Sequence, residues 1–146
     1  MSNIRLINHY LKYEEVENDL RKVFDSGIFS SGEYCENFKY KLSQSLKVNY
    51  THLTTSATTA LWLCLKLLNV GESDEVIVSD FSFPATANVV EDLGAKPVFA
   101  DVSLKSFNMN PDELSKLITT KTKAVIFVDS FGNTSGLEKI YEICKS

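Results

Sequence analysis

A run of small hydroxyl residues, at positions 54–59, leads from a short apolar stretch into a strongly apolar segment and is the clearest candidate for chemistry. A helix that begins at Ala57 would present unpaired backbone N–H groups and the positive end of its dipole, an arrangement that binds phosphate. The hydroxyl groups of Ser56 and Thr58 could donate to the same anion. The alternative is that Ser56 only caps a buried helix, as serine commonly does.

The pattern around this junction indicates which elements must position it. Two segments, 14–26 and 34–46, carry apolar side chains at helical spacing and predict amphipathic helices. From residue 48 onward, continuously apolar runs alternate with helical segments, which is typical of parallel strands covered on both faces. The predicted strands are 48–54, 75–78, 97–100 and 124–128, and the predicted helices are 57–68, 85–93, 111–118 and 136–145.

The alternation of strand and helix predicts an α/β fold, with an open, mostly parallel sheet and helices on both faces. We expect two regions, an N-terminal helical segment over residues 1–47 and a partial α/β domain over residues 48–146. Ligands of such sheets bind beyond the carboxyl ends of the strands. The connections to inspect are therefore 55–58, 79–84, 101–110 and 129–135.

Two of these connections carry recognisable local signals. Loop 79–84 contains Phe81 and Phe83, and an exposed ring there could stack on a flat ligand. The alternative, that both rings fold back onto the core, is the expectation from the loop alone. Before helix 111–118, Asn110 is a predicted N-cap, with Glu113 spaced to complete a capping box.

Composition excludes several classes of function. The 15 basic and 19 acidic residues leave a formal charge of −4 without any basic run, which disfavours nucleic acid as a partner. Widely spaced Cys35, Cys64 and Cys144 form no CxxC pair, so we expect a reducing cytoplasm and neither disulfides nor a metal site. No apolar stretch is long enough for a signal peptide or a membrane span, so neither is expected.

Several runs together closely resemble the DegT/DnrJ/EryC1/StrS family of aminotransferases, which use pyridoxal 5'-phosphate (PLP) and mostly act on nucleotide-linked keto sugars. The runs are 71–78, 81–88 and 94–102, with further likeness at 31–32, 107–108 and 131–133. The likeness extends in order over nearly the whole chain. It implies the fold of the first part of the large domain of fold type I PLP-dependent aminotransferases.

The resemblance also implies roles for particular residues. Ala57 and Thr58, next to Ser56, match the loop whose amides and hydroxyl hold the cofactor phosphate, so that phosphate binding now outweighs capping alone. Phe83 matches the aromatic side chain that stacks on the pyridine ring. Most relatives have glycine at the position of Ala57, but the first turn of a helix needs no positive φ. Asn88 lies one helical turn past the loop and is expected to support the site from behind.

The same resemblance implies that the chemical centre lies elsewhere. Transamination needs a lysine that binds the cofactor and moves the proton, and a carboxylate that keeps the pyridine nitrogen protonated. In the family both follow the helix that ends here at Ser146, so no catalytic residue is assigned, and Lys96, Lys121 and Lys123 are most simply surface charges. We therefore expect a truncated N-terminal portion of an aminotransferase, without its C-terminal domain and inactive alone.

The expected parent enzyme moves an amino group, usually from glutamate, onto a nucleotide-linked keto sugar in amino-sugar or surface polysaccharide biosynthesis, and works as a homodimer. Whether the truncation reflects a broken reading frame, a split gene or the boundary of a piece is left open. One alternative is a non-catalytic α/β remnant that binds a phosphate compound or a partner chain. An unrelated flavodoxin-like or Rossmann domain is disfavoured because no G-x-G-x-x-G follows the first clear strand.

Overall fold

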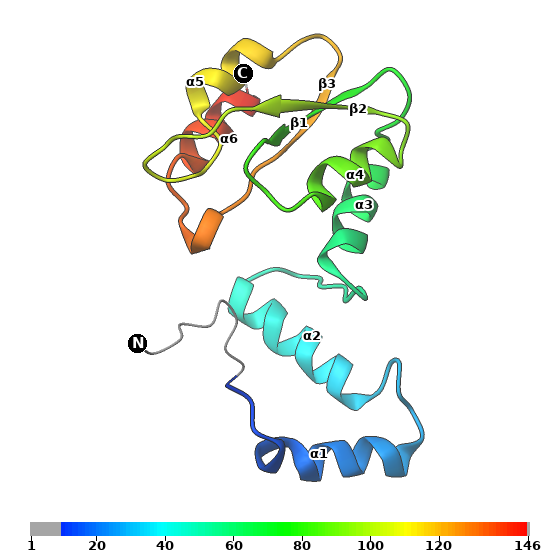
Figure 1. The fold of residues 1–146 in the computed structure, drawn as a ribbon. Coiled ribbons are helices and arrows are strands. Elements are labelled where there is room, and N and C mark those ends of the chain that lie inside the picture. The colour runs from blue at the N-terminus through cyan, green and yellow to red at the C-terminus, as the bar shows by residue number, and fades with distance from the viewer. Residues whose placement is uncertain (1–9, 146) are drawn as a thin grey trace. The chain divides into compact units, whose positions relative to one another are not determined.

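The computed structural model describes residues 10–145. The chain divides into two compact units, Met1–Leu53 and Thr54–Ser146 (Figure 1). We call them the helical unit and the sheet unit, and each is described by itself.

The helical unit contains two helices, α1 (Tyr13–Ser26) and α2 (Glu33–Leu46), which confirm the helices predicted there. The left-handed residue Gly27, with φ of 67°, ends α1 by donating its N–H to Phe24 O. Neither helix contains a buried residue, so the described part of this unit, residues 10–53, has no closed core of its own. The hydroxyl of Tyr34 donates to Asp19 Oδ1 at 2.8 Å, and this hydrogen bond lowers the pKa of the Asp19 carboxyl.

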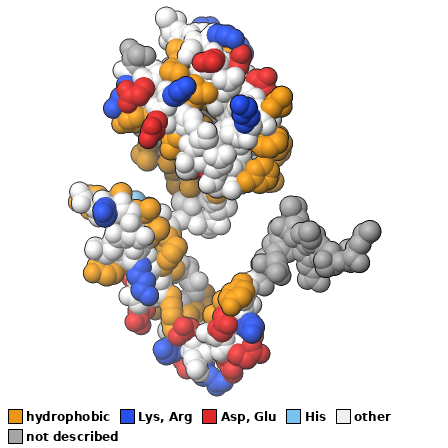
Figure 2. All heavy atoms as spheres, turned by 90° about the vertical axis from the view of Figure 1, so that its left-hand side faces the viewer, with side chains coloured by type: hydrophobic (Ala, Val, Ile, Leu, Met, Phe, Trp, Pro, Cys, Tyr) orange, Lys and Arg blue, Asp and Glu red, His pale blue; other side chains and the backbone are white. Residues whose placement is uncertain are grey.

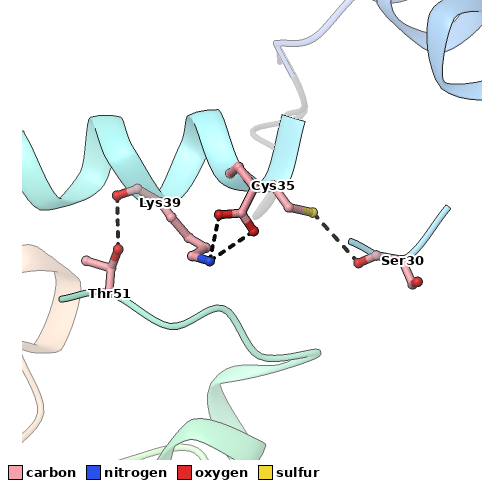
Figure 3. Close-up of polar contacts among 5 residues, drawn as sticks. Ser30, Cys35, Lys39 and Thr51 are labelled. Atoms are coloured by element: carbon pink, nitrogen blue, oxygen red, sulfur yellow. Dashed lines mark hydrogen bonds and ion pairs between the residues drawn. The ribbon is translucent and has the colours of Figure 1, made fainter. Parts of the chain in front are cut away.

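Polar contacts also attach α2 to the segments on either side of it (Figure 3). Before the helix, the Cys35 thiol donates to Ser30 O at 3.8 Å. After it, the Thr51 hydroxyl donates to Lys39 O at 2.9 Å. Within the helix, the Lys39 ammonium pairs with the Glu36 carboxylate at 2.9 Å. Residue 51 therefore folds back along the helix that precedes it.

The predicted strand 48–54 is wrong, because these residues form no strand. Val48 is 44% exposed and Tyr50 is 85% exposed, so the apolar run covers no core. A strand persists only where a neighbour satisfies its backbone N–H and C=O groups. Within residues 10–145 no strand pairs with this segment, and Thr51 contacts a helix instead.

In the sheet unit the described residues form a three-stranded parallel sheet in the order β2-β1-β3. This confirms the predicted open parallel sheet and the other three predicted strands. The strands are β1 (Glu75–Ser79), β2 (Lys96–Ala100) and β3 (Thr122–Ile126). The helices, as predicted to within two residues, are α3 (Ala57–Leu67), α4 (Ala85–Glu91), α5 (Pro111–Leu117) and α6 (Leu137–Lys145), with a short 3₁₀ helix, η1 (Ser130–Gly132).

The central strand β1 divides the core between its two faces. Val76 and Val78 pack in a cluster with Leu65 of α3 and with α4, whereas Ile77 packs in a second cluster with Leu114 of α5 and with α6. Alternate side chains of a strand point to opposite faces, so α3 and α4 cover one face and α5 and α6 the other (Figure 1). The connections that follow the strands consequently meet at the carboxyl edge of the sheet.

Glu75 joins the start of β1 to its neighbours. Its carboxylate accepts hydrogen bonds from the Thr119 hydroxyl at 2.8 Å and the Lys96 ammonium at 3.2 Å, and these contacts, Thr119 first, lower its pKa below the ordinary 4.5. A carboxyl whose pKa is lowered by folding stabilises the fold above its unfolded pKa, and this contribution is lost as pH falls through the folded pKa.

When the pH is lowered from 7 into the acid range, we expect the stability of the Glu75→Gln variant to fall less than that of the natural chain, because the variant has no carboxyl to protonate at this position. Thermal unfolding midpoints over that range measure this.

The matched control is Glu91→Gln in α4, an exposed position whose carboxylate accepts no hydrogen bond from any residue in 10–145. Equal pH profiles for the two variants would contradict the role of Glu75.

Candidate functional site

Ser56 is the N-cap of α3. It has an extended backbone, and its Oγ accepts the backbone N–H of Thr59 at 3.1 Å and lies 3.0 Å from the Thr59 hydroxyl. Ser56 therefore caps the helix, as the capping alternative predicted. An accepting serine oxygen still carries one proton, so Ser56 can cap the helix and donate at the same time.

The next two residues present unused donors. The backbone N–H groups of Ala57 and Thr58 and the hydroxyl of Thr58 have no acceptor among the described residues. Both residues are exposed at the positive end of an eleven-residue helix. Such a set of unused donors at a helix start can bind a phosphate. Ala57 lies in the helix itself, where an L residue is unstrained, so its methyl group adds no backbone cost.

Phe83, in the loop after β1, presents its ring to solvent while its backbone is anchored. The ring is 79% exposed, so the expectation that it folds back onto the core is wrong. Its carbonyl oxygen accepts the hydroxyl of Thr86 at 3.2 Å, and that hydroxyl lies 2.7 Å from the hydroxyl of Ser82. Ser82 in turn donates to Ser79 O at 3.2 Å. A fixed backbone with a free ring suits stacking on a flat ligand.

Asn88 lies further along α4, where its backbone N–H donates to Pro84 O at 3.0 Å. Its side chain is exposed and makes no hydrogen bond to any residue that the structure describes. Helices α3 and α4 pack against each other. The structure thus groups Ser56, Ala57 and Thr58 at one helix start and Phe83 with Asn88 at another, and no hydrogen bond in residues 10–145 joins the two groups.

Phe81 behaves differently from its neighbour Phe83. Its ring lies 5.3 Å from that of Phe107 and 6.3 Å from that of Phe131, and the last two are 6.0 Å apart. We call these three rings the aromatic cluster. They come from the connections after β1, β2 and β3, so Phe81 packs on neighbouring loops and remains 46% exposed.

Asn108 was noted in the sequence only as part of the family likeness at 107–108, and its role was missed. Its side chain is 1% exposed. Its amide nitrogen donates to Asn133 O at 2.7 Å and Ser135 O at 2.9 Å, and its amide oxygen accepts the N–H of Ser130 at 2.9 Å. A signal was present, because an amide between Phe107 and Met109 in a strand-end connection is expected to be buried only with its hydrogen bonds made.

Asn110 caps α5 as predicted, accepting the N–H of Asp112 at 3.0 Å. The predicted capping box with Glu113 is wrong. The Glu113 carboxylate binds Lys116 at 2.7 Å, and the N–H of Asn110 is already donated to Asp101 O at 3.0 Å. The competing backbone acceptor removes the donor that a capping box needs.

Charged side chains of both signs are interspersed on the face drawn in Figure 2, with hydrophobic side chains reaching the surface between them. No helix that the structure describes combines the length and the apolar character needed to cross a bilayer.

The model of the DegT/DnrJ/EryC1/StrS aminotransferase family matches residues 11–146. The chain is 35% identical over 130 residues to 3-oxo-glucose-6-phosphate:glutamate aminotransferase of Bacillus subtilis, covering 89% of this chain and 30% of that protein. It is 34% identical over 119 residues to GDP-perosamine synthase of Escherichia coli O157:H7, covering 82% and 33% of the two chains.

Among solved structures, Spr1654 of Streptococcus pneumoniae is known in PLP and PMP forms. It superposes on this chain with a TM-score of 0.84 and 32% identity, covering 89% of this chain and 33% of the other. The chain spans about a third of the length of the curated relatives it matches.

Proposed function

Since the chain belongs to the DegT/DnrJ/EryC1/StrS aminotransferase family, we propose that it forms the phosphate- and ring-binding part of a PLP-dependent sugar aminotransferase. The observation that carries the proposal is the start of α3. There, two backbone N–H groups and one hydroxyl lack acceptors within the described residues and lie in the first turn of the helix, at its positive end. These donors fit the dianionic phosphate of PLP.

Each predicted site residue has a physical role in this proposal. Ala57 and Thr58 donate to the phosphate, and Ser56 holds the helix start while offering its remaining proton. Phe83 stacks its exposed ring on the pyridine ring, with its backbone held by Thr86. Asn88 supports the end of the loop through its backbone N–H, which donates to Pro84 O at 3.0 Å. When bound, PLP supplies the electron-accepting ring on which amino transfer depends.

The proposed substrates follow from what the relatives' names say. The name of the GDP-perosamine synthase supports a nucleotide-linked sugar, and the name of the Bacillus subtilis aminotransferase supports an oxo sugar as the acceptor and glutamate as the donor. We propose the same substrate classes for the enzyme to which these residues contribute, in amino-sugar or surface polysaccharide biosynthesis. We further propose that this enzyme is a cytoplasmic homodimer.

Residues 1–146 by themselves are proposed to bind PLP without transaminating. The proposal is supported by the positions of the lysines, because Lys96 pairs with Glu75 at 3.2 Å, and Lys121 and Lys123 are exposed beside and within β3. In residues 10–145 no lysine contacts the donors at the start of α3 or the Phe83 loop through a hydrogen bond or ion pair.

Titration of the 146-residue chain with PLP tests both parts of the proposal. Absorbance follows binding, inorganic phosphate serves as a competitor, and borohydride reduction with mass measurement counts covalent lysine adducts. We expect saturable binding that phosphate competes away, and no single labelled lysine. Absence of saturable binding would refute the phosphate site, whereas one specifically labelled lysine would refute the proposed inactivity.

Removal of the two hydroxyls should weaken this binding. We expect Ser56→Ala with Thr58→Ala to lower the affinity for PLP by at least about tenfold, the loss expected from a single hydrogen bond to a charged group, which is worth at least about 1.5 kcal/mol. The substitution also removes a helix cap. Asn110→Ala, which removes the cap of α5 without touching α3, is the matched control. Equal affinities of the double variant and the natural chain would show that the phosphate lies elsewhere.

A further inference from the structure

The amide of Asn108 joins two loops that are far apart in sequence. It comes from the connection after β2, and its three hydrogen-bond partners, Ser130, Asn133 and Ser135, all belong to the connection after β3. The Ser130 hydroxyl adds a fourth bond in the opposite direction, to Phe107 O at 2.9 Å. Asn108 and Ser130 are both buried, so the bonds are shielded from competing water.

The residues beside these two buried side chains have unusual backbones. Phe107 precedes Asn108 and has φ of 60°, and Phe131 follows Ser130 and has φ of 57°. A left-handed conformation costs a residue other than glycine about 1–2 kcal/mol. Phe131 is 85% exposed and Phe107 is 41% exposed, so burial of the rings cannot offset that cost alone. The hydrogen bonds made by Asn108 and Ser130 are the contacts placed to offset it.

Both left-handed residues direct their rings against Phe81, at centroid distances of 5.3 Å and 6.3 Å. Phe81 is two residues before Phe83, in the loop whose polar contacts hold the Phe83 carbonyl. The aromatic cluster is therefore the link between the Asn108 bonds and the Phe83 loop.

We propose that Asn108 is a positioning residue. Its amide holds the loops after β2 and β3 together, sets the Phe107 and Phe131 rings against Phe81, and so fixes the loop that presents Phe83 to a bound pyridine ring. Only the last step rests on the proposed function.

Two variants of the 146-residue chain test this inference. Asn108→Asp keeps the size of the side chain but replaces the amide donors with a carboxylate oxygen that faces the carbonyls of Asn133 and Ser135. Asn110→Ala is the control, because it removes a cap two residues away without altering the bonds between the loops. The first measurement, by NMR, is of contacts between the Phe81 ring and the Phe107 and Phe131 rings, which needs no ligand. The second compares affinities for PLP and for inorganic phosphate.

We expect Asn108→Asp to lose the ring contacts and to bind PLP about tenfold more weakly, because two buried hydrogen bonds are lost. Its affinity for inorganic phosphate should stay within about twofold, since α3 is distant in sequence and shares none of the altered bonds. Asn110→Ala should keep both the ring contacts and the PLP affinity. A purely structural role would lower the affinities for PLP and phosphate equally, and that result, or unchanged ring contacts, would overturn the inference.

Two further outcomes remain separable. If the natural chain binds no PLP, the proposed function fails. The ring contacts still test whether the hydrogen bonds of Asn108 hold the aromatic cluster together. If Asn108→Asp does not fold, Ser130→Ala is used, because it removes only the bond to Phe107 O. It should weaken the ring contacts and reduce PLP affinity relative to phosphate affinity in the same direction, and no change in either would overturn the inference.

Discussion

Replacement of Ile77 by alanine is expected to lower the free energy of unfolding of the sheet unit by about 3 kcal/mol. Ile77 is fully buried in β1, the middle strand, opposite Val98 of β2 and Val125 of β3. Its side chain packs in the cluster that contains Leu114 and Met109. Truncation removes buried methyl groups and leaves a cavity that a strand bonded on both sides cannot close by moving.

Urea unfolding followed by circular dichroism and by the fluorescence of Trp62, the single tryptophan, measures this loss. Trp62 packs on the opposite face of the sheet from Ile77, so a shift in both transitions would show that the two faces unfold together. Lys123→Ala, at an exposed position in β3, is the control, with an expected change within about 0.5 kcal/mol. A loss below about 1 kcal/mol for Ile77→Ala would contradict the packing described for the face covered by α5 and α6.

The helices were predictable because the signals that begin and end them are local. Gly27 follows α1, Ser56 precedes α3 and Asn110 precedes α5, and in the structure each makes the terminal hydrogen bond expected of its residue type. The buried strands were predictable for a related reason. A continuous apolar run such as that of β1 is recognisable without knowledge of its neighbours, provided that neighbours exist.

The strand predicted at 48–54 shows that an apolar run without a pairing neighbour does not form a strand. Its residue types resemble those of the real strands, but pairing is a property of two segments, and within residues 10–145 no second segment pairs with this one. The aromatic loop residues illustrate the same limit. Phe81 and Phe83 share one loop, yet only Phe81 meets rings from the connections after β2 and β3. The role of Asn108 was missed because all the partners of its side-chain amide lie more than twenty positions away.

Thr58→Glu is expected to weaken the binding of PLP and of inorganic phosphate strongly while leaving the fold intact. The substitution places a carboxylate in the first turn of α3, where it is attracted by the helix dipole and stabilises the helix by about 0.3–1 kcal/mol. The same carboxylate occupies the position proposed for the phosphate and repels it. The affinity for both ligands should fall by about a hundredfold, equivalent to about 2.7 kcal/mol. Calorimetric titration with each ligand and thermal unfolding without ligand measure the two effects.

Stability is expected to rise while ligand affinity falls. This combination is specific to the proposed site, because a misfolded variant would lose stability and binding together. Thr58→Gln is the control, since it has a similar size without the charge and should reduce the affinity much less than Thr58→Glu. Equal losses of affinity for the glutamine and glutamate variants would indicate that the size of the new side chain, and not the charge of its carboxylate, displaces the ligand. Unchanged binding by Thr58→Glu would show that the phosphate does not lie at the start of α3, and would refute the proposed site.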